Sequence, residues 1–350
     1  MPGDPQHGLE PPPSDPASGP TSGPTRRRLV ISTALIPALA GAAQLIARPT
    51  AAAVGRNDRP LVLPLPTTQN DWRGVTRTLG RQGEVLAGTV YRVAFLRRDL
   101  RVVSKGVTIT PDLAVGSYIS FVRYADGSTL MMGDMAVLET ELQHVTDTLH
   151  AHGIGQTALH KHLLTQKPAI WWTHVHGHGH DAVALARGLR AALDRTGTPH
   201  TEPPATKAHR LDLDTAGIDA ALHAKGIQDG RIYKVIFARR ERIIDGSRVL
   251  PKGTGSMTAL IFQPVGHGRA AINGDFVLVA SEVQRVIAAL RHGGIDIVSL
   301  HSHGLTDSPR LFYIHFWAVD DAVKLARVLH RAVSTTNVSP PPRLTGRPGG

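Results

Sequence analysis

Histidine is the residue type in this chain best suited to bind a metal or to move protons. The chain has 350 residues, among them 19 histidines and no cysteine. The lack of cysteine excludes disulfide scaffolds, cysteine-type zinc fingers, iron–sulfur sites and thiol nucleophiles. Imidazole is therefore the leading candidate for metal ligation and for proton transfer near neutral pH.

Six histidines recur at matching positions in the two halves of the chain: His160, His162 and His174, then His301, His303 and His315. Residues i and i+2 of a strand share a face, so the H-x-H pair of each half points one way. A hairpin connection of about five residues would place His174 directly opposite His160, and His315 opposite His301, with Cβ atoms about 4.5–5.5 Å apart. A one-residue slip would turn the third histidine to the other face. This pattern predicts a three-His site in each repeat for a divalent transition metal, zinc before others.

The same histidines leave other interpretations open. They could be ordinary core or surface residues inherited from one ancestral unit. Two repeats could hold one site each, or share a single site between them. The imidazoles could act as general acid and base without a metal. A non-catalytic binding module of the cell envelope is a further alternative, so the sequence does not decide whether the protein is an enzyme.

Four carboxylates could complete such a site. Glu141 and Glu282 lie in the first turn of predicted helices, where they could act as ligand or base, or simply interact with the helix dipole. We take these two as tentative catalytic residues. Asp134 and Asp275 each follow a glycine on the preceding strand, and they could stabilise a bend or fix the tautomer of a histidine.

The first half also contains a denser histidine run, His176-Gly-His178-Gly-His180, directly after His174. The second half has Trp317-Ala-Val at the equivalent place, so only the first histidine of the run is shared. We expect this remainder to be flexible and to bind metal only adventitiously. No glycine-rich phosphate loop, H-E-x-x-H pair or G-x-S-x-G elbow is present.

The histidines recur because the chain contains an internal duplication. The segment 88–98, GTVYRVAFLRR, returns as GRIYKVIFARR at 230–240, and landmarks in one order follow it in both halves. Two homologous units therefore run from about 69 to 197 and from about 211 to 334. A proline-rich linker, 198–210, joins them, and a tail at 335–350 is predicted to be disordered.

Each unit is predicted to be α+β, an antiparallel sheet with a β-α-β-β-α core. Capping boxes begin the first helix of this core at Thr140 and at Ser281. An amphipathic helix over 181–193 closes the first unit. Strand composition is found at 90–95, 118–124, 130–138, 157–164 and 170–176.

Residues 1–53 have the features of an export signal rather than of a folded domain. The pair Arg26-Arg27 precedes an apolar run at 29–46, which Ala51-Ala52-Ala53 follows. This order predicts a cleaved signal peptide, and the paired arginines favour the twin-arginine type. We expect a secreted or cell-envelope protein without a stable membrane span after cleavage. An uncleaved anchor is the alternative, because the apolar run is nearly long enough to span.

The formal charge of +11 is spread along the chain without a basic run interleaved with aromatic residues. No nucleic-acid-binding module is recognisable, so nucleic acid is not an expected partner. An unidentified small molecule or cell-envelope ligand is expected instead.

Several motifs together resemble one family. They are the Y-R-V-x-F-x-R-x-D-L segment within 88–100, Gly133-Asp134, T-A-L-H-x-H-L-L at 157–164 and H-x-x-G-x-G at 174–179. The chain resembles the LppY/LpqO-like family of bacterial exported proteins, whose activity is unassigned. Lipoprotein members carry an acylated cysteine that this chain lacks, so the resemblance implies a soluble location. The middle residue of H-x-H is commonly Asn in the family, whereas Lys161 and Ser302 stand here.

A fainter similarity is to pterin carbinolamine dehydratases, which combine β-α-β-β-α order with three clustered histidines. The spacing differs, and the adjacent H-H-P of those enzymes is missing. This similarity implies the metal-free alternative, a lyase in which imidazoles act as acid and base.

Overall fold

The computed structural model describes residues 60–201 and 210–340. The predicted export signal at 1–53, most of the linker and the last ten residues lie outside the described part. The described residues fall in one contact unit, within which the two repeats pack against each other. No helix in these two stretches is long and apolar enough to cross a membrane.

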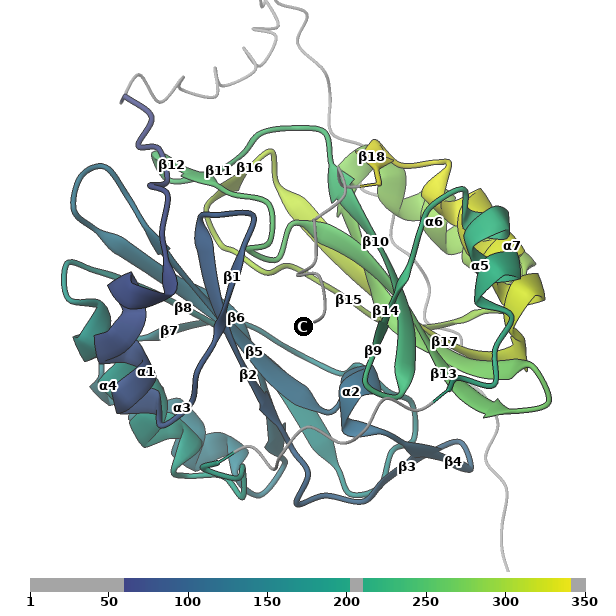
Figure 1. The fold of residues 1–350 in the computed structure, drawn as a ribbon, viewed down its shortest axis with the longest axis horizontal. Helices are drawn as coiled ribbons and strands as arrows, with labels where there is room; N and C mark the ends of the chain where they lie inside the picture. Colours follow the sequence, from purple (N-terminus) through teal and green to yellow (C-terminus); the bar gives the residue numbers. More distant parts are fainter. Residues whose placement is uncertain (1–59, 202–209, 341–350) are drawn as a thin grey trace, which may run out of the picture. The chain divides into compact units, whose positions relative to one another are not determined.

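The first repeat forms a six-stranded antiparallel sheet in the order β1-β2-β5-β6-β8-β7 (Figure 1). Its strands are β1 (Glu84–Leu86), β2 (Val90–Leu96), β5 (Gly116–Arg123), β6 (Thr129–Leu138), β7 (Gly155–His160) and β8 (Ile170–Gly179). A separate two-stranded hairpin consists of β3 (Val102–Ser104) and β4 (Val107–Ile109).

The second repeat forms the equivalent sheet in the order β15-β17-β14-β13-β10-β18, with β9 also pairing with β10. Its strands are β9 (Ile227–Asp229), β10 (Ile232–Arg239), β13 (Met257–Gly266), β14 (Arg269–Val279), β15 (Asp296–His301), β17 (Leu311–Asp321) and β18 (Val338–Ser339). A small three-stranded sheet consists of β11 (Ile243–Asp245), β12 (Arg248–Leu250) and β16 (Asp307–Ser308).

Helices cover one face of each sheet, and the other face of each sheet is turned toward the other repeat (Figure 1). On the first sheet they are η1 (Gln69–Trp72), α1 (Arg73–Leu79), α3 (Leu142–Ala151) and α4 (Ala182–Leu193). On the second sheet they are α5 (Thr215–Leu222), α6 (Ala280–His292) and α7 (Ala322–Val333), while α2 (Pro111–Ala114) is a short helix of the first repeat. The predicted α+β class, antiparallel sheets and two repeated segments are confirmed.

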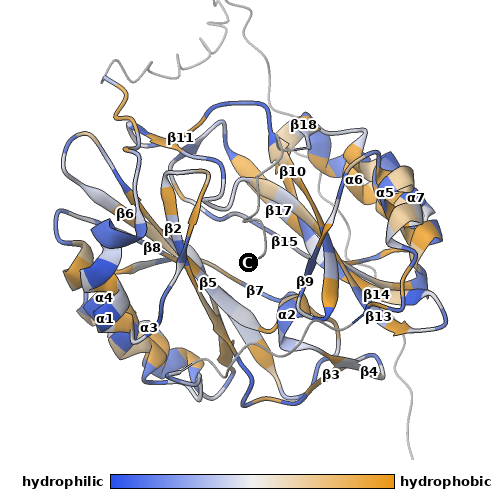
Figure 2. Cartoon of the chain, in the orientation of Figure 1, coloured by the Kyte–Doolittle hydropathy of each residue, from blue (hydrophilic) through white to orange (hydrophobic). Residues whose placement is uncertain are grey.

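Strand periodicity explains why each sheet has a helix-covered face. In β2, Tyr91, Val93 and Phe95 alternate with less buried residues and join the core beneath the helices. Leu189 of α4 packs into the same core from the helical layer. Figure 2 shows the result, with the hydrophobic colour on the helix faces that contact the sheets and the hydrophilic colour outside. Because these apolar residues are buried under the helices, the opposite face of each sheet is the one that faces the other repeat.

The two repeats contact each other through equivalent hairpins. The β3–β4 hairpin of the first repeat reaches the second, where Lys105 forms an ion pair of 2.7 Å with Asp296. The β11–β12 hairpin of the second repeat reaches the first, where Arg248 contacts Asp126 at 2.9 Å. An apolar cluster also contains residues of both repeats, including the fully buried Trp172. These contacts position the inner faces of the two sheets.

Two details differ from the sequence-based expectations. The strand predicted over 157–164 ends at His160. Beyond it, the carbonyls of Lys161 and His162 accept hydrogen bonds from Ser299 and Asn273 of the second repeat. The tail predicted to be disordered from residue 335 begins with ordered residues, since Val338 pairs with Arg239 as part of β18. The rest of that tail, from 341 onward, lies outside the described residues.

Candidate metal centre

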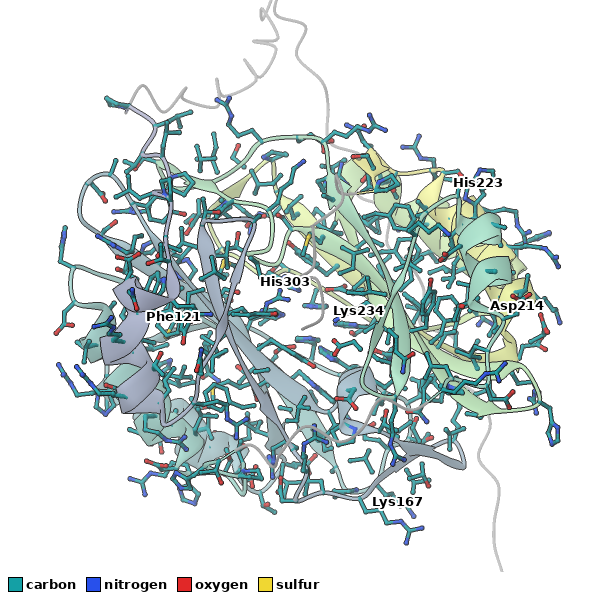
Figure 3. All side chains as sticks on the ribbon, in the orientation of Figure 1. Phe121, Lys167, Asp214, His223, Lys234 and His303 are labelled. Atoms are coloured by element: carbon teal, nitrogen blue, oxygen red, sulfur yellow. The ribbon has the colours of Figure 1, made fainter. Side chains whose placement is uncertain are left out.

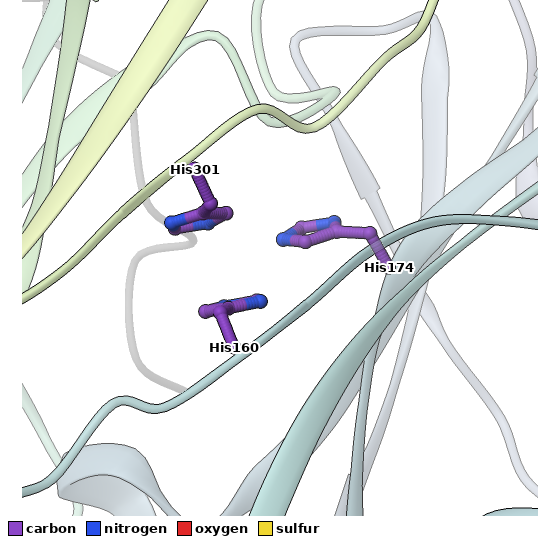
Figure 4. A group of neighbouring side chains, drawn as sticks. All are labelled: His160, His174 and His301. Atoms are coloured by element: carbon purple, nitrogen blue, oxygen red, sulfur yellow. The ribbon is translucent and has the colours of Figure 1, made fainter.

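All six predicted histidines meet between the inner faces of the two sheets. His160 and His301 are the last residues of β7 and β15, and His174 and His315 lie within β8 and β17. The remaining two, His162 and His303, lie two residues beyond the ends of β7 and β15. Figure 3 shows His303 in the middle of the view, between the sheets. Figure 4 shows the rings of His160, His174 and His301 turned toward one another.

The closest contacts between histidine rings of the cluster join one repeat to the other. The ring centroids lie 3.7 Å apart for His160 and His301, and 3.9 Å apart for His162 and His315. The rings of His174 and His303 are likewise 3.7 Å apart. When each histidine is replaced by its equivalent in the other repeat, the pair His160–His301 stays the same. The pair His162–His315 becomes His303–His174, and the reverse. The cluster therefore has approximate two-fold symmetry and is shared, which corrects the prediction of a separate three-His site in each repeat.

The predicted strand register is wrong by two residues. His174 pairs with Ala158, and His160 pairs with Trp172, rather than His160 with His174. In the second repeat His315 likewise pairs with Ser299. A shift of two residues keeps each side chain on its face, because the side-chain period of a strand is two. The histidines therefore converge despite the error, and His160 and His174 have ring centroids 5.2 Å apart.

Two groups of three histidines have ligand atoms close enough to hold one ion. These groups are His160, His174 and His301, and His160, His162 and His315, each with its atoms within 4.8 Å of one another. Both groups take residues from both repeats, and both contain His160. Zn–N bonds near 2.0–2.1 Å place neighbouring nitrogens of a tetrahedral site about 3.3 Å apart. The ligand atoms of both groups are thus at most about 1.5 Å farther apart than in such a site.

The histidine cluster contains buried polar atoms that lack hydrogen-bond partners among the described residues. They include both ring nitrogens of His301, Nδ1 of His160 and Nε2 of His174 and His315. An unpaired buried polar group is costly and calls for an explanation such as an ion. His315 shows the arrangement most clearly, because its Nδ1–H donates to the carbonyl of Gly274 at 2.7 Å. The Nε2 lone pair of His315 is thereby available to bind a metal ion. A group of imidazole nitrogens such as this one fits a divalent transition metal.

Burial keeps the six imidazoles neutral. It lowers the pKa of His162 to about 3 and, with repulsion from His162, the pKa of His315 to about 4. Burial likewise lowers the pKa of the other four well below the ordinary value for histidine. Neutral imidazole is the form that binds metal ions.

Two equivalent carboxylates contact the histidines. Asp134 Oδ2 lies 2.9 Å from Nε2 of His162, and Asp275 Oδ2 lies 3.3 Å from Nε2 of His303. Burial raises the pKa of Asp275 to about 7, with a further contribution from Asp134, and burial also raises the pKa of Asp134. These aspartates are placed to orient imidazoles, or to exchange a proton near neutral pH.

The glycine before each aspartate brings the strands close together. A Cβ on Gly133 would lie 2.1 Å from the carbonyl oxygen of Tyr118, and one on Gly274 would lie 2.0 Å from that of Ala259. Real Cβ atoms cannot approach a carbonyl so closely, so glycine is required at both places. In the Gly-Asp motif, the glycine therefore permits a close contact between strands, and the aspartate supplies a carboxylate to the cluster.

A cavity of about 220 Å³ adjoins the cluster and is lined by both repeats. His162, His174, His303 and His315 are among its lining residues, as are both aspartates. Arg92 of β2 and Lys234 of β10 are equivalent in the two repeats, and both also line it. The volume is suitable for a small molecule that touches histidines and cationic side chains together.

Glu141 and Glu282, the tentative catalytic residues, bind buried arginines instead of entering this cavity. Glu141 accepts two hydrogen bonds from Arg97, and Glu282 accepts two from Arg239. Each glutamate also accepts from a backbone N–H at the start of its helix. These bonds occupy the carboxylates and account for them as structural groups. A catalytic role stays a prediction that their placement does not support.

The histidine run that follows His174 forms, together with Asp245, a second group of possible metal ligands among the described residues. His176 and His178 belong to β8, so the expectation that they lie in a flexible segment is wrong. Both rings contact Asp245 of β11, with Nε2 atoms 2.8 and 3.1 Å from Oδ2. The alternation H-V-H-G-H continues the period of a strand and could have indicated this placement. Nothing local in the sequence could have indicated Asp245, which comes from the other repeat.

Similarity to solved structures is slight. The double-ringed trimeric shell protein MSM0271 from the RMM microcompartment is 12% identical, over 59% of this chain and 82% of that chain, with a TM-score of 0.18. The trimeric bacterial microcompartment shell protein PduB is 12% identical, over 72% of this chain and 92% of that chain, with a TM-score of 0.19. At these TM-scores the similarity carries no argument. No curated protein matches the chain.

Comparison with protein families agrees with the internal duplication. The model of the Domain of Unknown Function (DUF1259) matches residues 73–195 and again residues 216–335. Together the two segments span more than half of the chain, and each corresponds to one repeat. The chain therefore belongs to this domain family and carries two tandem copies of the domain.

Proposed function

We propose that the six-histidine cluster binds a divalent transition metal, zinc before others, and acts on a small substrate in the adjoining cavity. The observation that carries the proposal is the convergence of neutral imidazoles from both repeats with buried ring nitrogens left unpaired. A divalent ion held there supplies Lewis-acid chemistry, which suits hydrolysis or proton abstraction. His160, as a member of both ligand groups, is the residue on which binding depends most.

The residues around the cluster have complementary tasks in this proposal. Asp134 and Asp275 orient His162 and His303 through their short contacts. The pKa of Asp275 near 7, raised mainly by burial, lets this carboxyl hold or release a proton next to the substrate. Arg92 lines the cavity, and its Nε has no hydrogen-bond partner within the described part of the chain, so an anionic group on the substrate would find a donor there.

A second candidate function is metal-free acid–base catalysis, as in the lyases to which the sequence bears a faint similarity. The specific observation in its favour is the same Asp275 carboxyl, whose raised pKa of about 7 suits proton transfer without any ion. Under this alternative the unpaired ring nitrogens would contact the substrate itself.

We also propose that the protein is exported, and that its closer relationship is to the LppY/LpqO-like proteins. The support is the arrangement of paired arginines, apolar run and small residues within 1–53, together with the motifs around Gly133 and His160. The site would then act outside the cytoplasm, where a folded and metal-loaded protein is delivered by twin-arginine export.

Metal analysis of the purified protein, expressed without a His tag and dialysed after zinc loading, tests the proposed function. The wild-type protein should retain zinc, and His160→Ala should retain at least one zinc fewer per chain. His180→Ala is the matched control, because this exposed histidine follows β8 and lies outside both ligand groups. Equal zinc content in wild type and His160→Ala would contradict the proposal. A wild-type protein that retains no zinc would favour the metal-free alternative.

A further inference from the structure

We propose a second divalent-metal site, made by His176, His178 and Asp245, which joins the two repeats. The two histidines come from β8 of the first repeat and the aspartate from β11 of the second. Their ligand atoms all lie within 4.8 Å of one another. None of the three belongs to either ligand group of the six-histidine cluster. The proposal is therefore independent of the function proposed for that cluster.

The geometry is close to that of a bound ion. Both Nε2 atoms point at the same carboxylate oxygen, at 2.8 and 3.1 Å. Bonds near 2.0–2.1 Å place neighbouring ligand atoms of a tetrahedral zinc about 3.3 Å apart. An ion could therefore enter after an outward shift of a few tenths of an ångström. Two imidazoles and one carboxylate are a common ligand set for first-row divalent ions and leave coordination positions open.

Asp245 is held in place before any ion arrives. Its side chain is only 8% exposed, and its second oxygen, Oδ1, accepts a hydrogen bond from the hydroxyl of Thr306. The carboxylate is thus oriented by a neighbouring side chain, as hydrogen-bonded metal ligands are.

The site is not a by-product of the duplication. The equivalents of His176 and His178 in the second repeat are Trp317 and Val319, and the hairpin position of Asp245 is occupied by Ser104 in the first. No imidazole or carboxylate remains at any of the three. The group of His176, His178 and Asp245 therefore has no counterpart at the equivalent positions, although the two repeats are otherwise related by approximate symmetry.

A small cavity connects this group with the central cluster. His176 and Asp245 line it together with His303 and Met132. An ion at the second site would tie a strand of one repeat to a hairpin of the other, close to the shared cluster. We expect its main effect to be on stability, because an ion that binds only the folded arrangement stabilises it by mass action.

The alternative explanation is that His176, His178 and Asp245 form only hydrogen bonds and bind no metal. One variant distinguishes metal binding from this alternative. His176→Gln/His178→Gln keeps amide donors that can reach Asp245 but removes both imidazole ligands. Zinc content after dialysis should fall by one equivalent in this variant and in Asp245→Asn. His180→Ala should leave it unchanged. A His160→Ala/His301→Ala protein, which lacks the central ligands, should still bind one zinc.

Thermal unfolding gives a second readout in that central-site variant. Zinc should raise the Tm of His160→Ala/His301→Ala by several degrees, and this rise should disappear when His176→Gln/His178→Gln is added. Unchanged zinc content in the glutamine variant, with no loss of the zinc-dependent rise in Tm, would overturn the second site. That result would leave the proposal for the central cluster untouched, because its own ligands are intact in the glutamine variant.

Discussion

At the scale of single residues, the central feature is a group of imidazoles kept neutral and only partly hydrogen-bonded. Burial removes their ability to hold a proton at neutral pH, while Asp134 and Asp275 provide acceptors that face His162 and His303. Such an arrangement is expensive without a ligand, since buried nitrogens without partners cost about 1–3 kcal/mol each. A bound ion would satisfy several of them at once, which is why we favour metal binding over an ordinary core.

The lowered pKa values predict acid sensitivity of the metal-free protein. In the unfolded chain these histidines titrate near 6.5, whereas in the fold the pKa of His162 is about 3 and that of His315 about 4. The unfolded state therefore binds more protons below about pH 6.5, and the free energy of unfolding falls as the pH drops. Asp134 and Asp275 have raised pKa values, so their protonation stabilises the fold as the pH drops. The six imidazoles outnumber these two carboxylates, and the net effect of a lower pH is a loss of stability.

We expect the free energy of unfolding, measured by urea titration with a chelator present, to fall by at least about 2 kcal/mol between pH 7 and pH 5. The double variant His162→Gln/His315→Gln should show a shallower pH dependence, because two of the groups that gain protons on unfolding are gone. A stability that is flat over this range in the wild-type protein would show that the imidazoles are not held neutral.

At the scale of elements, the start of α3 and of α6 is held by the same device in both repeats. A buried arginine from the end of the first long strand, Arg97 or Arg239, binds the glutamate at the helix start. The glutamate also accepts from a backbone N–H just before the helix, at Leu138 or Val279. In place of the predicted capping boxes at Thr140 and Ser281, these ion pairs hold the helix start to a strand. The two glutamates also accept hydrogen bonds from the backbone N–H of Gly197 and of Asn337, near the end of each repeat.

Replacement of one of these glutamates should therefore affect stability and not metal binding. Glu282→Gln removes the more buried of the two charge partners of Arg239, for which we expect a loss of about 3 kcal/mol in the free energy of unfolding. Glu241→Gln, on the more exposed partner of the same arginine, should cost less than about 1 kcal/mol. Zinc content of the folded Glu282→Gln protein should equal that of wild type, whereas a loss of zinc at unchanged stability would indicate that Glu282 serves the site.

Much of the element order could be predicted, because periodicity and the duplication are local signals. The strands at β2, β5 and β6 and the helix α4 begin and end within a few residues of their predicted bounds. The register of β7 on β8 could not, because β7 already ends at His160 and its connection to β8, which begins at Ile170, is longer than the expected five residues. The sharing of histidines between repeats, and the contact of Asp245 with β8, depend on how the sheets pack, which no single segment encodes.

At the scale of the whole chain, duplication explains the architecture of the site. Each domain copy alone supplies three of the six histidines and one of the two aspartates, and the copies bring them together across an approximate two-fold axis. The exception is the group at Asp245, where the copies have diverged. The family assignment accounts for the repeats, because each copy of the domain corresponds to one of them.

The proposed export can be tested without any assay for the site. A folded reporter fused after Ala53 should be secreted through the twin-arginine pathway, and replacement of Arg26 and Arg27 by lysine should block its secretion. A strain that lacks this pathway provides the control. Continued export of the wild-type fusion in that strain would show that another route is used.

The most direct test of the shared metal centre is anomalous scattering at the zinc edge from crystals of the zinc-loaded protein. The account predicts a peak within bonding distance of His160 and of at least one of the second repeat's histidines, His301 or His315. Among the six rings of the central cluster, a zinc bound by histidines of one repeat only, or the absence of any peak, would contradict it.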